Sequence, residues 1–183
     1  MTQEQYNKSI ETGELQLSLR DKSSHYGIVE FLLFIPLVFL SIILFYYFKG
    51  DPKPFVSAEI YIILFPVFLS MLFYLLLKKR LKFKVLHSEL DHKDLTAHLI
   101  QLCKEQNWTI SFHNANIFIA KTNISLTSWG ERVTVLFNGN EILVNSISDP
   151  DGKPSLIAIG PNRDNVKAVI DLIENINYLD HKA

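Results

Sequence analysis

The side chains that could carry out chemistry are scattered along this chain and do not form a recognisable pattern. His87, His92 and His98 lie five and six residues apart, whereas two histidines that bind zinc from one helix are four residues apart. Cys103 is the single cysteine, so there is no disulfide framework and no Cys-x-x-Cys pair. It lies five residues after His98, off that residue's helical face, and no orienting acid accompanies them. We therefore expect no catalytic residues, metal or cofactor, and no enzyme activity.

Two short motifs share part of the pattern of known ligand-binding loops. The run Asp149–Gly152 begins like a calcium loop, but it lacks the third ligand position and the closing glutamate, so a plain turn is the better interpretation. The run Gly160–Arg163 precedes an expected helix, whose N-terminus beside an arginine can bind an anion. Without a glycine-rich loop or P-loop lysine, a capped turn is favoured there.

Trp129 is the candidate for contact with a partner. It directly precedes Gly130 between two expected strands, where a tryptophan either fills the core or lies exposed. Tryptophan is enriched at interface hot spots, whereas core packing is the plainer alternative in a small domain.

Two almost purely apolar stretches, residues 28–48 and 58–77, determine the expected architecture. Each has roughly the 20 residues that an α-helix needs to cross the hydrocarbon core of a bilayer. Helices satisfy all their backbone hydrogen bonds internally, and two segments cannot close a barrel. We therefore expect a two-helix transmembrane hairpin.

A few residues within these stretches are candidates for special roles. Pro36 and Pro66 lie near the middle of the two spans and are candidate helix kinks, because proline removes a backbone donor. They open a gate on one interpretation and are ordinary membrane-helix prolines on the other. Glu30 is a candidate intramembrane polar contact that could pair with Lys78 or Lys79; the alternative is snorkelling into the headgroup region.

Basic residues predict the orientation of the hairpin. Five of them follow the second span directly: Lys78, Lys79, Arg80, Lys82 and Lys84. Such residues are retained on the cytoplasmic side, so both termini are expected in the cytoplasm, with the protein integral to a plasma or bacterial inner membrane. This basic cluster also attracts anionic lipid headgroups, although it is first of all an ordinary topogenic signal.

The remainder of the chain, residues 85–183, has the pattern of a small α+β domain. A helix is expected from Asp91 to about Gln106, with leucines at helical spacing, and four or five antiparallel strands follow. Asn138-Gly139 is a strong hairpin signal, and residues 156–159 are the expected last strand. An apolar stripe predicts a final helix starting at Asn162 or Asp164. The predicted fold is a two-layer α-β(4–5)-α domain with both helices on one face of an antiparallel sheet.

The polar N-terminal segment, residues 1–26, has two interpretations. Leu15, Leu17 and Leu19 alternate with polar residues, so residues 14–20 could add a strand to the sheet edge. A disordered tail is the default for a terminus.

Charge and composition limit the function. From Val85 onward there are twelve acidic and eight basic residues, a balance that does not favour nucleic acid. We expect a non-enzymatic accessory subunit, anchored in the membrane, whose cytoplasmic domain docks on a protein partner or on itself. The alternative is a small oligomeric pore or transport component that uses the kinked hairpin. No small-molecule substrate is identified.

Overall fold

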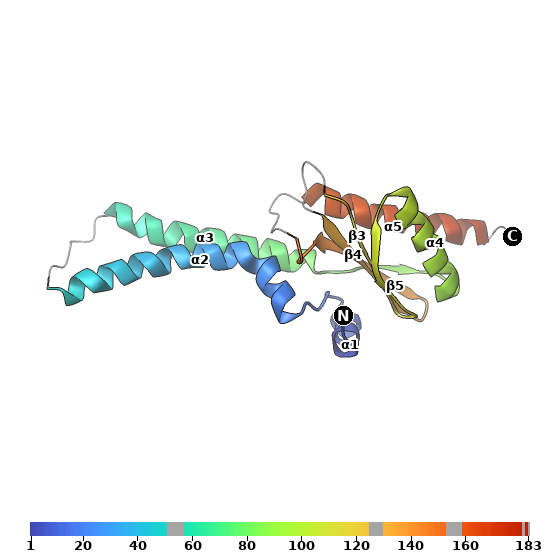
Figure 1. The fold of residues 1–183 in the computed structure, drawn as a ribbon, viewed down its shortest axis with the longest axis horizontal. Coiled ribbons are helices and arrows are strands. Elements are labelled where there is room, and N and C mark those ends of the chain that lie inside the picture. The colour runs from blue at the N-terminus through green and yellow to red at the C-terminus, as the bar shows by residue number, and fades with distance from the viewer. Residues whose placement is uncertain (51–56, 125–129, 153–158, 181, 183) are drawn as a thin grey trace. The chain divides into compact units, whose positions relative to one another are not determined.

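The computed structural model describes residues 1–50, 57–124, 130–152, 159–180 and 182. Over these residues the chain forms five α-helices and a five-stranded antiparallel sheet (Figure 1). The elements are α1 (Gln3–Thr12), α2 (Leu19–Phe48), α3 (Ser57–Arg80), β1 (Lys84–His87), α4 (His92–Glu105), β2 (Thr109–His113), β3 (Ile117–Lys121), β4 (Glu131–Asn138), β5 (Glu141–Ser148) and α5 (Ile159–Asp180).

The chain divides into two compact units. The hairpin unit is His25–Lys79, and the sheet unit combines Met1–Ser24 with Arg80–Ala183. The N-terminal segment therefore packs with the C-terminal domain, although two long helices separate them in the sequence. This grouping is the main feature of the fold that bears on function.

In the hairpin unit, the long apolar helices α2 and α3 form a hairpin. At the end where both connect to the sheet unit, the His25 ring Nε2 lies 3.1 Å from the Leu77 carbonyl oxygen. The rings of Tyr26 and Tyr74 pack with their centroids 5.5 Å apart. By length and composition, both helices could cross a membrane.

Both helices are longer than the sequence predicts. The expected spans, 28–48 and 58–77, lie within them, but α2 starts at Leu19 and α3 runs to Arg80. The extra turns are polar, so apolar content alone could not locate these ends. They belong to the sheet unit at Leu19–Ser24 and at Arg80.

The sheet has the strand order β1-β5-β4-β3-β2, with every neighbouring pair antiparallel. The predicted β4–β5 hairpin is present, but its two loop residues are Gly139 and Asn140, one position later than predicted. Of these two, only Gly139 has a positive φ, at 56°. A single positive φ at the first loop residue is the pattern of a type II′ turn and not of type I′.

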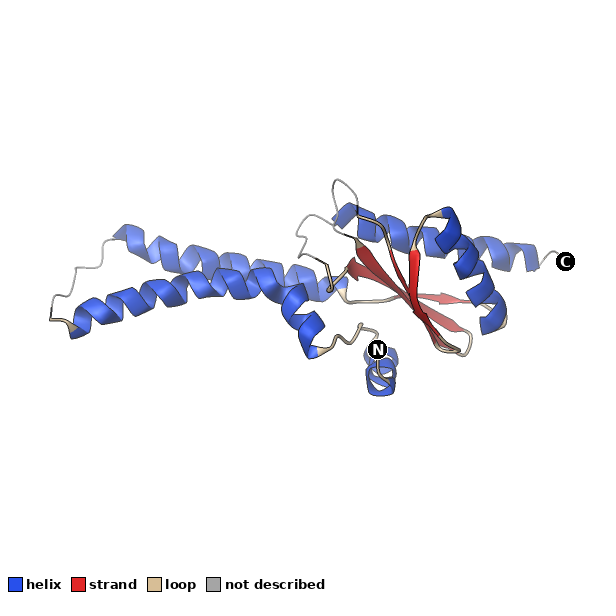
Figure 2. Ribbon diagram, in the orientation of Figure 1, coloured by secondary structure: helices blue, strands red, loops and turns tan. Residues whose placement is uncertain are grey.

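One face of the sheet is covered by α4 and α5, as Figure 2 shows. The leucines of α4 at helical spacing are buried there, together with Val169 and Ile173 of α5. The strand residues of this helix face alternate along β3, β4 and β5 and are apolar: Phe118, Ala120, Val133, Val135, Phe137, Ile142 and Val144. The two predicted helices therefore do share one face of the sheet.

The second face of the sheet is not left open, which the two-layer prediction missed. The strand residues between those of the helix face point to it and are also buried: Ile117, Thr134, Leu136, Leu143, Asn145 and Ile147. The N-terminal segment supplies buried Tyr6, Leu15 and Leu17, and the chain just after α3 supplies Leu81 and Phe83. The N-terminal segment therefore adds to the domain that the sequence placed in residues 85–183.

Two local expectations differ from the structure. All of residues 14–20 are described, and they contain a single β-bridge, between Glu14 and Lys82, instead of a strand. Of the expected strand 156–159, residues 156–158 lie outside the described residues, and Ile159 is the first residue of α5. The helix α5 therefore starts before the predicted Asn162, with Pro161 in its first turn, where proline is tolerated.

Candidate functional site

The N-terminal segment begins with a well-capped helix. The Thr2 hydroxyl accepts a hydrogen bond from the Gln5 backbone N–H at 3.2 Å, and the Gln5 side chain accepts one from the Thr2 N–H at 2.8 Å. This capping box satisfies two of the N–H groups that a helix start leaves unpaired. Gly13 ends the helix at a φ of 65°, a conformation that glycine adopts without steric penalty.

Buried contacts fix α1 and the following residues to the sheet unit. The Tyr6 hydroxyl donates a 2.5 Å hydrogen bond to the Phe137 carbonyl oxygen on β4, and burial raises the pKa of Tyr6. Further along, the Leu15 N–H donates to the Leu81 carbonyl at 2.8 Å, and the Phe83 N–H donates to the Gly13 carbonyl at 3.0 Å. The N-terminal segment is therefore bound to the sheet unit both within α1 and just after it.

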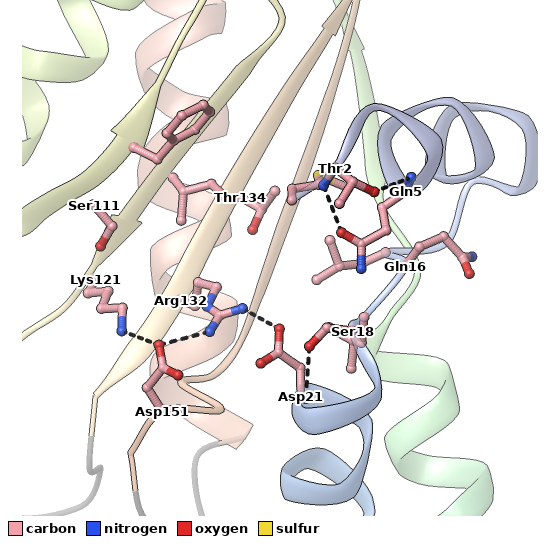
Figure 3. Close-up of a pocket in the computed structure, with 15 residues that line it drawn as sticks. Thr2, Gln5, Gln16, Ser18, Asp21, Ser111, Lys121, Arg132, Thr134 and Asp151 are labelled. Atoms are coloured by element: carbon pink, nitrogen blue, oxygen red, sulfur yellow. Dashed lines mark hydrogen bonds and ion pairs between the residues drawn. The ribbon is translucent and has the colours of Figure 1, made fainter.

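A cluster of five charged side chains lies where the N-terminal segment enters α2 (Figure 3). Arg132 of β4 lies at its centre: its Nη1 lies 2.9 Å from Asp21 Oδ2, and its Nη2 lies 3.4 Å from Asp149 Oδ1 and 3.2 Å from Asp151 Oδ2. Lys121 is the cross-strand neighbour of Arg132 on β3, and its Nζ lies 2.8 Å from both Asp149 and Asp151. Two cations therefore face three carboxylates.

The pairing shifts two of these pKa values. Burial by itself lowers the pKa of Lys121, but the hydrogen bonds and charges of Asp149 and Asp151 outweigh it and raise the value. The hydrogen bond from Lys121 lowers the pKa of Asp151, and the positive charges of Arg132 and Arg20 add to this effect. Both groups are therefore held in their charged forms at neutral pH.

A cavity of about 430 Å³ lies beside this charged cluster, between the N-terminal segment and the second sheet face. Its charged wall carries Lys121, Arg132, Asp21 and Asp151. Hydroxyl and amide groups and apolar side chains form the remaining walls: Thr2, Gln5, Gln16, Ser18, Ser111 and Thr134 among the polar ones, and Met1, Leu15, Leu17, Phe112 and Ile119 among the apolar ones. This mixture suits binding of a small molecule better than acid–base catalysis, because every carboxylate there is paired with a cation.

A second clamp lies on the same sheet face, where the chain leaves α3. The Asn145 amide Nδ2 donates to the carbonyl oxygens of Arg80 at 2.9 Å and Lys82 at 3.0 Å. Asn145 is the register partner of Thr134. Its Oδ1 is the one buried side-chain polar atom without a hydrogen-bond partner in the described part of the chain. The entry to α2 and the exit from α3 are therefore both bound by polar side chains of the central strands.

The predicted basic cluster continues from the end of α3 into β1. Lys78, Lys79, Lys82 and Lys84 are exposed, whereas Arg80 is half-buried. Leu81 and Phe83 between them are buried, so Lys82 and Lys84 are directed outward by strand-like alternation. Whether this cluster binds anionic lipid stays a prediction.

The candidate kinks lie inside continuous helices. Pro36 is a buried residue of α2, on a stripe with Val29 and Leu32. Pro66 is a buried residue of α3. Both prolines therefore lie on inward faces of the hairpin unit and not on its exposed surface. Glu30 is exposed on α2, and Trp129 lies outside the described residues.

The scattered histidines and the cysteine are either packed against neighbouring residues or exposed, and they do not form a common site among the described residues. The His92 ring stacks on Phe137 with centroids 5.0 Å apart, and its Nε2 lies 2.8 Å from the Gly139 carbonyl oxygen. His87 and His98 are exposed. Cys103 is buried in the core, and burial raises its pKa to about 11, so it is a poor nucleophile at neutral pH. Among the described residues, no three His, Cys, Asp or Glu side chains form a group suited to a metal ion.

The two loop motifs also take ordinary forms. In the run Asp149–Gly152, the Gly152 N–H donates to the Asp149 carbonyl at 2.9 Å, which closes a turn. The run Gly160–Arg163 lies in the first turn of α5 and not before the helix. The sequence did not reveal that the Asp149–Gly152 turn places Asp149 and Asp151 beside Lys121. It also missed Arg132 and Asp21, because 111 residues separate this pair and no local pattern connects them.

Comparisons with known proteins do not assign the chain to a family: no family model matches it, and no curated protein shows significant similarity to it.

Proposed function

We propose that this protein is a non-enzymatic, membrane-anchored interaction subunit. In this proposal α2 and α3 cross the membrane as a hairpin, and the sheet unit docks on a partner protein or on a second copy of the chain. The observation that carries the proposal is the packing of the N-terminal segment Met1–Ser24 with the domain that follows α3. Two chain ends that form one folded unit must lie on the same side of a membrane.

The exposed surfaces of α2 and α3 support the membrane assignment. A helix that is apolar all round is suited either to a protein core or to lipid, and these helices expose large apolar side chains over residues 31–48 of α2 and 60–76 of α3. Those of α2 include Phe31, Phe34, Leu37, Ile42 and Phe45, and those of α3 include Ile62, Phe65, Phe68, Met71 and Leu75. Water is a poor solvent for so much apolar surface, and a bilayer is a good one.

The charges favour the cytoplasmic side for the sheet unit. Arg20 and Lys22 lie at the start of α2, and the basic cluster defined above follows the end of α3, so positive charge accompanies both helix ends. The positive-inside rule then predicts cytoplasmic termini in a plasma or inner membrane. The exposed lysines would attract anionic lipids by about 1 kcal/mol each.

The pairing of charged groups in the sheet unit supports an interaction role. The charges of the Arg132 cluster pair with one another, and the one buried thiol is inert, so the described residues give no acid, base and nucleophile set. Trp129 stays the predicted contact residue, because it follows from the sequence alone. The domain would thus act by binding and the hairpin by anchoring.

The test is extraction of the tagged protein in a mild detergent, followed by particle mass measurement and mass spectrometry of co-purifying proteins. A stoichiometric second protein or a defined homo-oligomer is expected. Trp129→Ala should weaken that assembly with the domain still folded, whereas Tyr178→Ala, a matched loss of an exposed aromatic side chain on α5, should not. A monomer without partners would contradict the proposal.

A second candidate function is a small oligomeric pore or transport component. It is favoured by the two prolines, one in each helix, which are both buried within the hairpin unit and could act as a pair of hinges. Ion flux in liposomes that is abolished by Glu30→Gln would support this candidate. Absence of flux from reconstituted oligomers would exclude it.

A further inference from the structure

We propose that the cavity between the N-terminal segment and the second sheet face binds a small carboxylic acid with an apolar body, whose carboxylate takes the place of Asp21 on Arg132. This inference concerns a ligand and does not depend on the partner or the pore. It rests on the cavity volume, on the charged side chains at one wall, and on a buried hydroxyl that lines the cavity.

The buried hydroxyl belongs to Thr134. This residue is 1 % exposed and lines the cavity beside Arg132 (Figure 3). A ligand oxygen placed in the cavity would accept a hydrogen bond from this hydroxyl. Ser111 places a second hydroxyl on the same cavity wall.

Asp21 is the exchangeable member of the charged cluster. Asp149 and Asp151 each bind both Arg132 and Lys121 and belong to the turn after β5. Within the described residues, the Asp21 carboxylate forms an ion pair with Arg132 alone, at 2.9 Å, and Asp21 comes from the separate N-terminal segment. It is therefore held by the fewest contacts.

Charge counting favours a carboxylate for this exchange. The cluster has three carboxylates and two cations, so adding an anion would increase the negative excess. Replacing the Asp21 carboxylate by a ligand carboxylate leaves the count unchanged. The guanidinium of Arg132 is planar and can donate two parallel hydrogen bonds to a carboxylate.

The other walls determine the remainder of the ligand. Leu15, Leu17 and Ile119 provide an apolar surface, and Phe112 adds an aromatic ring. A volume of about 430 Å³ is within the range of small-molecule sites. An acid with an aromatic or branched aliphatic body fits this surface better than acetate does. Binding would release the start of α2 from Arg132.

The direct test is ¹⁹F NMR of 4-fluorobenzoate titrated into the full chain in lipid nanodiscs. Saturable binding is expected for the native protein. Asp21→Asn should bind the probe about tenfold more tightly, because the internal competitor is removed, and Arg132→Gln should weaken binding at least about tenfold. Opposite changes in probe affinity for Asp21→Asn and Arg132→Gln are expected only if the probe displaces Asp21 from Arg132.

Three controls keep the test decisive. Asp94→Asn removes an exposed carboxylate from the first turn of α4, on the helix face of the sheet, so it matches the charge change of Asp21→Asn and should retain native affinity. Thr134→Val keeps the side-chain shape and should weaken binding a few-fold, even if Arg132→Gln does not fold. The neutral analogue 4-fluorobenzyl alcohol should not bind.

Several results would overturn the proposal. These are equal affinities of the native protein and Asp21→Asn, native affinity in both Arg132→Gln and Thr134→Val, and no saturable binding to Asp21→Asn up to about 10 mM probe. A second arm places oleic acid in the nanodisc bilayer. If oleic acid displaces the bound probe, the acid comes from the membrane; if bound probe stays in place, the site takes a water-soluble acid.

Discussion

The two faces of the sheet are both buried, but different interactions bury them. On the helix face, apolar side chains of β3, β4 and β5 pack against the apolar stripes of α4 and α5. On the second face, a segment from the opposite end of the chain also buries Leu15 and Leu17, but a tyrosine hydrogen bond, a β-bridge and a charged cluster add to this apolar contact. Apolar packing fixes a fold strongly and without regard to salt, whereas charge pairs are weaker and respond to salt and pH.

This difference assigns a role to each face. The helix face makes the domain stable, and the second face connects the domain to the two points where the chain enters α2 and leaves α3. A contact that must respond to a ligand or partner has to be weaker than the core that carries it. We therefore expect the two faces to respond differently to the same kind of perturbation.

The largest effect is expected on the helix face, from Leu95→Ala. Leu95 is 2 % exposed in the core cluster, and such truncations lower the free energy of unfolding by about 2–5 kcal/mol. Urea unfolding of the full chain in detergent, followed by tryptophan fluorescence, measures this. Leu179→Ala, the same change at an exposed position of α5, should alter it by less than about 0.5 kcal/mol.

Arg132→Gln should have the next largest effect, on the second face. It leaves Asp21 and Asp149 without their guanidinium partner in half-buried surroundings, so we expect a loss of about 2 kcal/mol in the free energy of unfolding. The difference from the native protein should shrink in 1 M salt. An unchanged difference at high salt would show that the cluster acts through packing and not through charge.

A smaller effect is expected from Tyr6→Phe, which removes only the hydrogen bond to the Phe137 carbonyl. We expect a loss of about 1 kcal/mol. The loss should be accompanied by faster proteolysis after the lysine and arginine residues of the N-terminal segment, while α4 and α5 keep native protection. An equal loss of protection from proteolysis in the N-terminal segment and in α4 and α5 would contradict separate roles for the two faces.

The smallest effect concerns pH. Because the folded-state pKa of Asp151 lies below its usual 3.8, its contribution to stability is present above that value and is lost as the pH falls through the folded pKa. Asp151 is 45 % exposed, so the contribution should be under about 1 kcal/mol. Asp151→Asn should therefore lose less stability than the native protein between pH 5 and pH 3 in calorimetric unfolding.

The helix face and the hairpin could be predicted from the sequence because both follow from short-range periodicity. Leucines at helical spacing predicted α4, alternating apolar residues predicted β4 and β5, and two apolar stretches predicted α2 and α3. The β4–β5 turn was displaced by one residue, since Gly139 adopts a positive φ in either turn type.

The second face could not be predicted in the same way. The helix α1 buries only Tyr6 and Ser9, so it has no apolar stripe, and its readable signal is the capping pattern of Thr2 and Gln5. The pairing of Asp21 with Arg132 joins residues that are 111 positions apart. Contacts of this kind depend on tertiary packing, which leaves no local pattern.

The N-terminal segment and the C-terminal domain form one unit, and we propose that this unit lies on the cytoplasmic side of a membrane hairpin. The most direct measurement is labelling of single cysteines by a membrane-impermeant maleimide in intact and in lysed cells. Thr2→Cys, Lys49→Cys and Lys182→Cys would each be placed in a Cys103→Ala background. We predict that Lys49→Cys reacts in intact cells, whereas Thr2→Cys and Lys182→Cys react only after lysis. Labelling of Thr2→Cys and Lys182→Cys from opposite sides would contradict the account.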